Sequence, residues 1–178
     1  ALLVLSACQS QKTEEPVLTK SGLNPADFET VVDGDSVALY TLTNANGMEV
    51  CVTNFGGRIV SIMAPAKDGN MYDVVLGHDS IADYLNIDGN FGALIGRYGN
   101  RIENGKFSLD GVEYVLPQNN YSDCLHGGTK GFHNAVWKAN QTGDNTSELT
   151  LSTPDGYAGF PGNVDAKVVY SLDNENAL

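Results

Sequence analysis

The stretch GRYGNRIENGKFSLDGVEYVLPQNNYSDCLHGG, residues 96–128, decides how this chain folds. Apolar and polar residues alternate on both sides of Asp110-Gly111, which is a strong signal for a two-residue β-hairpin. The apolar positions are Phe107, Leu109, Val112, Tyr114 and Leu116. Because a hairpin returns the chain to the edge where it started, Arg101 and His126 are expected to face one glycine-lined cleft. A guanidinium and an imidazole in such a hollow suit a neutral ligand rich in hydroxyl groups.

Short strands are expected along most of the remaining chain. Beyond the central hairpin they are expected at 37–43, 48–55, 58–64, 73–76, 135–139, 148–152 and 163–172, with turn residues between them. Asn46-Gly47 predicts a second hairpin. One short helix is expected over 81–85, because Ser80 and Asp83 resemble a capping box. This spacing predicts an all-β fold, an antiparallel sandwich or barrel.

Composition excludes several classes of protein. A hydrophobic content of 42% and 20 glycines indicate a folded, turn-rich chain rather than a disordered one. The net charge is −12, from 10 basic and 22 acidic residues, so nucleic acids and anionic membrane surfaces would repel the chain. The sequence contains neither a phosphate-binding loop nor a dinucleotide fingerprint. We therefore expect no nucleic-acid partner. We also expect a monomer that binds a small molecule.

The three cysteines form no pair with the spacing of a metal or redox site. Cys51 lies in an alternating strand and is expected in the core. Cys124 precedes His126 by two residues, so a regular strand would direct both side chains to the same side. A cysteine–histidine nucleophile is one interpretation. A thiol packed beneath the site is the favoured one.

The first residues resemble the end of a bacterial lipoprotein signal segment, with the lipobox Leu5-Ser6-Ala7-Cys8. On this interpretation Cys8 carries lipid, residues 1–8 form the signal tail and 9–34 form a tether and lead-in. Residues 35–178 then form the domain, held at the bacterial cell envelope, periplasmic or at the outer membrane, only through the lipid anchor. The last residues resemble a turn followed by the start of a strand, so we expect the sandwich to be incomplete.

Five motifs, in the same order along residues 37–172, resemble the aldose 1-epimerases, also called galactose mutarotases. They are Asn54-Phe55-Gly56-Gly57, Asp73-Val74-Val75-Leu76-Gly77, Asn100-Arg101-Ile102, Leu125-His126-Gly127-Gly128, and Pro154-Asp155-Gly156 with Phe160-Pro161-Gly162. The resemblance implies a galactose mutarotase-like supersandwich. It also implies an enzyme that interconverts the α and β anomers of free aldoses such as galactose or glucose.

The resemblance further implies a division of the site. Asn100 and Arg101 would bind sugar hydroxyls, and His126 would support catalysis and binding on the ring-oxygen side. In the family the general acid is a histidine in an Asn-His-x-Tyr-Phe-Asn-type motif and the general base is a late glutamate. Neither motif occurs in these 178 residues, so this chain is expected to supply the sugar-binding half and to be inactive alone.

Alternatives remain for the same residues. The chain could instead be a non-catalytic carbohydrate-binding sandwich lipoprotein, and a hexose-phosphate epimerase would need more basic residues. Arg97 is interpreted as a member of a surface ion pair, and His78 and His133 as structural or solvated residues. No cofactor is required for acid–base ring opening, and no metal-ligand spacing is present. Calcium stays an open alternative, because acidic loops could supply oxygen ligands.

Overall fold

The computed structural model describes residues 16–178, and the lipobox with Cys8 lies outside them. The strands are β1 Thr30–Val32, β2 Asp35–Val37, β3 Leu39–Thr43, β4 Glu49–Thr53, β5 Arg58–Pro65, β6 Met71–Asp73, β7 Arg101–Ile102, β8 Lys106–Leu109, β9 Val112–Val115, β10 Cys124–Leu125, β11 Lys138–Gly143, β12 Thr146–Thr153 and β13 Val164–Ser171. One α-helix, α1 Ile81–Asn86, and four 3₁₀ turns accompany them: η1 Pro25–Phe28, η2 Glu103–Gly105, η3 Phe132–Asn134 and η4 Tyr157–Gly159. No helix within residues 16–178 is long and apolar enough to cross a membrane.

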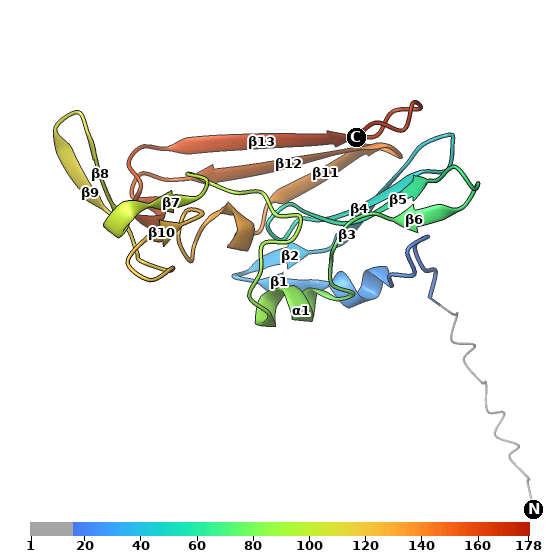
Figure 1. Ribbon diagram of the computed structural model, residues 1–178, viewed down its shortest axis with the longest axis horizontal. Helices are drawn as coiled ribbons and strands as arrows, with labels where there is room; N and C mark the ends of the chain where they lie inside the picture. The colour runs from blue at the N-terminus through green and yellow to red at the C-terminus, as the bar shows by residue number, and fades with distance from the viewer. Residues whose placement is uncertain (1–15) are drawn as a thin grey trace, which may run out of the picture.

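Two antiparallel sheets, β3-β4-β5-β6 and β11-β12-β13, form the body of the molecule. Figure 1 shows the second sheet along the top, with β1, β2 and α1 on the opposite side of β3 and β4. One apolar cluster joins the two sheets and includes Leu42, Val50, Trp137 and Leu149. Burial of this apolar surface is the main force that holds the sheets together. Every ladder between the named strands in this part of the chain is antiparallel, which confirms the predicted all-β sandwich.

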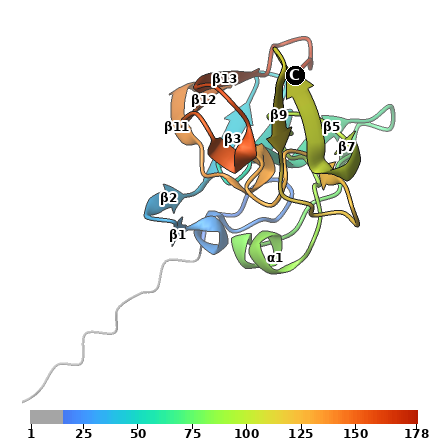
Figure 2. The same ribbon diagram turned by 90° about the vertical axis from the view of Figure 1, so that its left-hand side faces the viewer.

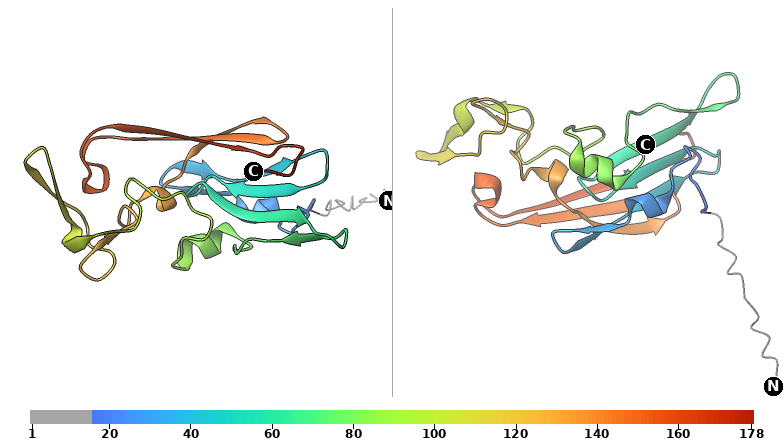
Figure 3. Two further views of the ribbon diagram at one scale, coloured as in Figure 1. Left: turned by 45° about the horizontal axis from the view of Figure 1, so that its top comes forward. Right: turned by 90° about the horizontal axis from the view of Figure 1, so that it is seen from below.

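Strand β4 lies in the middle layer, and all five of its residues are buried. Val50 and Val52 face the cluster between the sheets, whereas Cys51 belongs to a second cluster with Phe28 and Tyr84. Side chains alternate between the two faces of a strand, so one strand contributes to both cores. Figure 3 shows η1 and α1 covering this second face in its right-hand view. Cys51 is therefore a core residue, as predicted.

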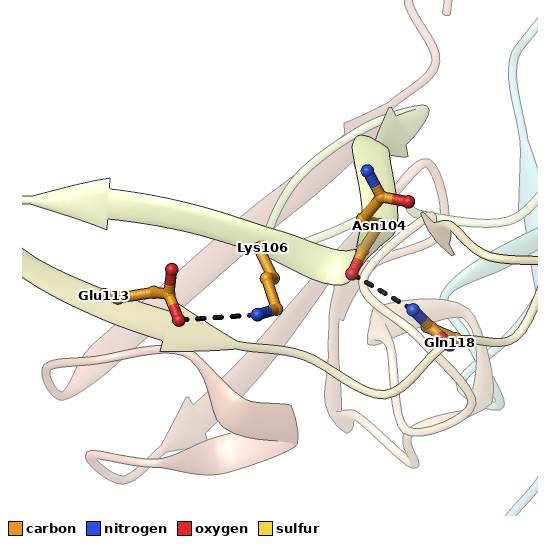
Figure 4. Close-up of polar contacts among 4 residues, drawn as sticks. All are labelled: Asn104, Lys106, Glu113 and Gln118. Carbon is orange, nitrogen blue, oxygen red and sulfur yellow. Dashed lines mark hydrogen bonds and ion pairs between the residues drawn. The ribbon is translucent and has the colours of Figure 1, made fainter.

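The central hairpin and the capped helix form as predicted. Strands β8 and β9 pair around Asp110-Gly111 and project from one end of the molecule, where Figure 2 shows them facing the viewer. Figure 4 shows the base of this hairpin, where Lys106 pairs with Glu113 at 3.5 Å and Gln118 donates to the Asn104 carbonyl at 3.1 Å. In helix α1, the Asp83 N–H donates to the hydroxyl of Ser80, which is the N-cap.

Two predicted strands have the wrong bounds. The strand expected at 73–76 is β6 at Met71–Asp73, and Val74 and Leu76 are exposed. A carboxylate oxygen of Asp73 accepts the N–H groups of both Ile62 and Val75, which ends the regular ladder there. The strand expected at 135–139 begins only at Lys138, because residues 135–137 instead run past the bend at Phe55.

The lead-in before residue 35 packs with the domain. Phe28 is completely buried, and Leu23 joins the same cluster. Strand β1 pairs with β2 from Thr30↔Val37 to Val32↔Asp35, so the boundary expected at residue 35 falls inside a hairpin. These contacts place residues 23–34 in the layer that covers the outer face of β4.

Candidate functional site

Strands β7 and β10 bring the two predicted site segments side by side. Leu125 lies opposite Arg101 and Cys124 lies opposite Ile102. Beyond the ladder, the His126 N–H donates to the Asn100 carbonyl at 3.1 Å, and the Asn100 N–H donates to His126 Nδ1 at 3.0 Å. Arg101 and His126, which are 25 positions apart in sequence, thus lie on segments that run side by side, with His126 directly after the end of β10.

Asn100 and His126 both leave the strand conformation, with φ angles of 68° and 55°. Such left-handed values are uncommon for residues other than glycine, although asparagine tolerates them. The turn after His126 is also crowded, because a Cβ on Gly127 would clash with the Gly96 carbonyl. Glycine at 127 therefore allows the His126 segment to approach the segment that carries Arg101.

The contact with Asn100 determines how a neutral His126 ring carries its proton. Since Nδ1 accepts the Asn100 N–H, the proton of the neutral ring sits on Nε2. The half-buried imidazole can then donate from Nε2 to an oxygen atom. His126 can therefore act as a hydrogen-bond donor to a neutral ligand oxygen.

Arg101 is exposed and is oriented by two asparagines. Its Nε donates to Asn120 Oδ1 at 3.0 Å, and its Nη1 lies 3.4 Å from Asn100 Oδ1. The Asn100 side chain also accepts the Arg101 backbone N–H at 2.9 Å. Nη2 has no partner among residues 16–178. The guanidinium is thus positioned while part of its hydrogen-bonding capacity stays available to a ligand.

Arg101 lines a cleft of about 440 Å³, here called the Arg101 cleft. The other lining residues are Arg97, Tyr98, Ile102, Glu103, Phe107 and Phe160. The Phe107 and Phe160 rings stack with centroids 6.0 Å apart. The cleft therefore combines an aromatic wall with a guanidinium, a combination suited to a ligand with both apolar and hydroxyl faces. Asn100 and His126 are not among its lining residues, so the expectation that Arg101 and His126 face one cleft is not confirmed by the cleft that Arg101 lines.

Arg97 is an anchor rather than part of a surface ion pair, so that interpretation is wrong. Its guanidinium donates to the carbonyls of Thr153, Pro154, Pro161 and Gly162 and to the Thr153 hydroxyl, at 2.7–3.1 Å. These acceptors lie 56 to 65 positions away in sequence. The five-donor fork of arginine suits such a set of carbonyl oxygens. Arg97 thus joins the segment that carries Arg101 to the turn between β12 and β13.

Cys124 packs in the small core beneath β7 and β10. It is 1% exposed and belongs to a cluster with Leu116 and Phe160. Burial raises the pKa of its thiol, so the nucleophilic thiolate is disfavoured. His126 lies beyond the end of β10, so the expected same-side placement of the two side chains does not follow from a regular strand. These facts support the interpretation of Cys124 as a packing residue.

A second arginine–histidine pair, Arg58 with His133, was not singled out as functional by the sequence. Arg58 is 1% exposed and donates to the carbonyls of Gly89, Phe91 and His133. Its guanidinium lies 5.6 Å from the Phe55 ring centroid and 5.1 Å from that of Tyr84. The signal available in sequence was an arginine directly after Gly56-Gly57, at the start of an otherwise apolar strand.

His133 is buried and uncharged at neutral pH. Removal from water, together with the nearby Arg58 charge, lowers the pKa of His133 to about 4. Its Nδ1 has no hydrogen-bond partner within residues 16–178. A Cβ on Gly131 would clash with both the His126 carbonyl and the His133 ring, so the two histidines flank that glycine closely. The buried position of His133 contradicts the solvated interpretation and favours the structural one. Residues 16–178 contain no cluster of three or more His, Cys, Asp or Glu side chains that could hold a metal ion.

The chain belongs to the aldose 1-epimerase family. The model of that family, described as Aldose 1-epimerase, matches residues 38–178. The aldose 1-epimerase of Escherichia coli is 36% identical over 146 residues, which cover 82% of this chain and 42% of that protein. The galactose mutarotase of Bos taurus is 40% identical over 126 residues, covering 71% of this chain and 36% of that protein.

Solved structures agree with the family and with the predicted mutarotase-like fold. The galactose 1-epimerase from Lactobacillus acidophilus matches with a TM-score of 0.71 and 30% identity, covering 83% of this chain and 43% of that one. An aldose epimerase homologue from C. elegans matches with a TM-score of 0.75 and 26% identity, covering 79% of this chain and 43% of that one. The chain spans about two fifths of the length of the relatives it matches.

Proposed function

We propose that the protein to which this chain belongs is an aldose 1-epimerase that interconverts the α and β anomers of free aldoses such as galactose or glucose. The observation that carries the proposal is the joining of Asn100-Arg101 to His126 through β7 and β10, in a chain of this family. The described residues supply the sugar-binding half of the site.

The geometry supports a role for each predicted residue. Arg101 donates to sugar hydroxyls from the guanidinium edge that its asparagine partners leave unpaired. Asn100 positions both partners, because its backbone contacts His126 and its side chain contacts Arg101. His126 donates from Nε2 on the ring-oxygen side and thereby stabilises the oxygen as the ring opens.

Anomer exchange also needs a general base at the C1 hydroxyl and a general acid at the ring oxygen. Each such group typically contributes about 10²–10⁴-fold to the rate. The family resemblance places these groups in motifs that the 178 residues do not contain, so we expect these residues alone to bind sugar without turning it over. If the whole gene product also bound sugar without turning it over, the protein would instead be a non-catalytic carbohydrate-binding sandwich.

The test is the rate of anomer equilibration, followed by polarimetry on the protein as its gene encodes it. Replacing Arg101 or His126 with alanine should lower kcat/KM by about 10²-fold or more, because each removes a donor aimed at the reacting sugar. Lys138→Ala is a matched control, since Lys138 is an exposed cation on β11. Unchanged rates in both site variants would refute the assigned site, and no catalysis by the unaltered protein would refute the activity.

We further propose that acid–base ring opening here needs no cofactor, because it involves no redox change and no group transfer. Calcium is the alternative, and addition of a chelator separates the two. An unchanged rate in excess EGTA supports the cofactor-free mechanism, whereas a loss of rate that calcium restores contradicts it.

The proposed location is the bacterial envelope, where lipid on Cys8 would anchor the protein. Mass spectrometry of the N-terminal peptide tests that modification directly.

A further inference from the structure

A second cavity lies beside helix α1 and has a volume of about 350 Å³. None of Asn100, Arg101 and His126 is among its lining residues, so it is separate from the proposed epimerase site. We call it the amide cavity, because asparagines dominate its polar lining. The residues with polar side chains in that lining are Tyr84, Asp88, Asn90, Asn119, Asn120, Thr129, His133 and Asn134.

Several polar groups of the amide cavity are not used by the fold. Asn134 donates its amide to the Thr129 carbonyl at 3.1 Å, which leaves its own carbonyl oxygen available. Asn120 accepts from Arg101 through Oδ1, which leaves its two amide hydrogens available. The exposed side chains of Asp88 and Asn90 make no hydrogen bond within residues 16–178. The cavity therefore presents donors and acceptors together.

The charge of the cavity favours a neutral ligand. None of its lining residues is a lysine or an arginine, and His133, with a pKa of about 4, is uncharged at neutral pH. An anion would thus meet the Asp88 carboxylate with no cation in the wall. A cation would find a single carboxylate in the lining, that of the exposed Asp88.

The volume of the amide cavity and its apolar rim narrow the class of ligand further. The volume is at the lower end of the range of about 300–1,000 Å³ found for ligand sites. Leu85 and Ile87 line the cavity with 45% and 50% of their surface exposed. Such apolar groups beside unpaired amides match a pyranose, which has an apolar C–H face and a rim of hydroxyls.

We propose that the amide cavity is a second binding site for a neutral, polyhydroxylated ligand of monosaccharide size. Asn120 links the two sites, because its Oδ1 accepts from Arg101 while the residue also lines the amide cavity. A ligand that orders Asn120 would change sugar affinity at Arg101, and the reverse effect would be equal in free energy.

The experiment is a titration of the ¹⁵N-labelled gene product with methyl β-D-galactopyranoside, followed through the side-chain amide signals of Asn90, Asn120 and Asn134. This probe lacks a free anomeric hydroxyl, so binding is read independently of epimerase activity. In an Arg101→Ala background, which disables the Arg101 cleft, saturable shifts should persist. Inorganic phosphate should produce none.

Two exposed side chains are then removed together, Asp88→Ala with Asn90→Ala. The loss of two hydrogen bonds should raise the Kd by about tenfold or more. Asn140→Ala is the matched control, an exposed asparagine on β11 outside the cavity. The proposal is overturned by absence of saturable shifts in the Arg101→Ala background, by equal Kd values for the double variant and the control, or by saturable binding of phosphate.

Discussion

Two arginine–histidine pairs in this molecule have opposite environments. Arg58 and His133 are 1% and 7% exposed, and carbonyl oxygens and aromatic rings surround the Arg58 guanidinium. Arg101 is exposed and His126 is half-buried, and two asparagines hold the Arg101 guanidinium from its flank. Arg58 uses its two Nη groups to hold carbonyls of the fold, and its Nε and His133 Nδ1 are buried without a partner among residues 16–178. The outer pair instead keeps exposed hydrogen-bonding capacity for a ligand. Burial, rather than residue type, separates architecture from function here.

The energetic reason lies in solvation. A buried guanidinium loses its hydration, which is costly unless acceptors replace the water. Three carbonyls and two ring faces replace it at Arg58, and no carboxylate among the described residues forms an ion pair with it. Changes at this pair should therefore alter stability, and changes at the outer pair should alter ligand binding. Four measurements test this division, from the largest expected change in stability to the smallest.

Arg58→Ala should cause the largest loss of stability. It removes a buried guanidinium together with its bonds to one buried and two part-buried carbonyls, so the free energy of unfolding should fall by about 3–4 kcal/mol. Chemical denaturation of this variant and of Lys138→Ala provides the comparison. A loss no greater than that of the exposed lysine control would contradict the structural role of Arg58.

His133 should make stability depend on pH. Its pKa is about 4 in the folded protein, against 6.5 for an ordinary histidine, so the unfolded chain binds the additional proton first as pH falls. The stability that His133 contributes is fully present above pH 6.5, decreases as pH falls below 6.5 and stops decreasing below about pH 4. The total change in the free energy of unfolding is about 3 kcal/mol. Between pH 4 and 6.5, the free energy of unfolding should depend more steeply on pH for the unaltered protein than for His133→Gln. Equal slopes would mean that His133 is not held neutral.

Arg97→Ala should have an intermediate effect. The half-buried guanidinium loses contacts to the turn between β12 and β13, so the free energy of unfolding should fall by about 2 kcal/mol. Because Arg97 also fixes the segment before Arg101, sugar affinity should weaken in the same variant. Arg97→Lys should recover little of the stability or of the sugar affinity, since an ammonium group cannot reproduce the planar set of donors of a guanidinium. Full recovery by lysine would show that charge alone matters at this position.

Arg101→Ala should hardly change stability. An exposed side chain away from the core usually contributes within about 0.5 kcal/mol, although this variant should lose sugar binding at the Arg101 cleft. Denaturation and sugar titration of the same sample give both values. A stability loss as large as that of Arg58→Ala would remove the distinction between the two pairs.

Sequence alone predicted the elements whose signals are local. The alternation around Asp110-Gly111 gave the β8–β9 hairpin, and Ser80 with Asp83 gave the start of α1. The pairing of the Arg101 and His126 segments was also predictable, because a hairpin between them returns the chain. Local patterns failed at 73–76, where an apolar run suggested a strand but the Asp73 side chain ended the ladder.

The sequence by itself determined an all-β sandwich, its main hairpins and the segments that carry Asn100, Arg101 and His126. Only the tertiary structure decided which arginine side chains stabilise the fold. The acceptors of Arg58 lie 31 to 75 positions away and those of Arg97 lie 56 to 65 positions away. Turn chemistry and strand alternation act over a few neighbouring residues, whereas the desolvation of a charge depends on every segment that packs around it.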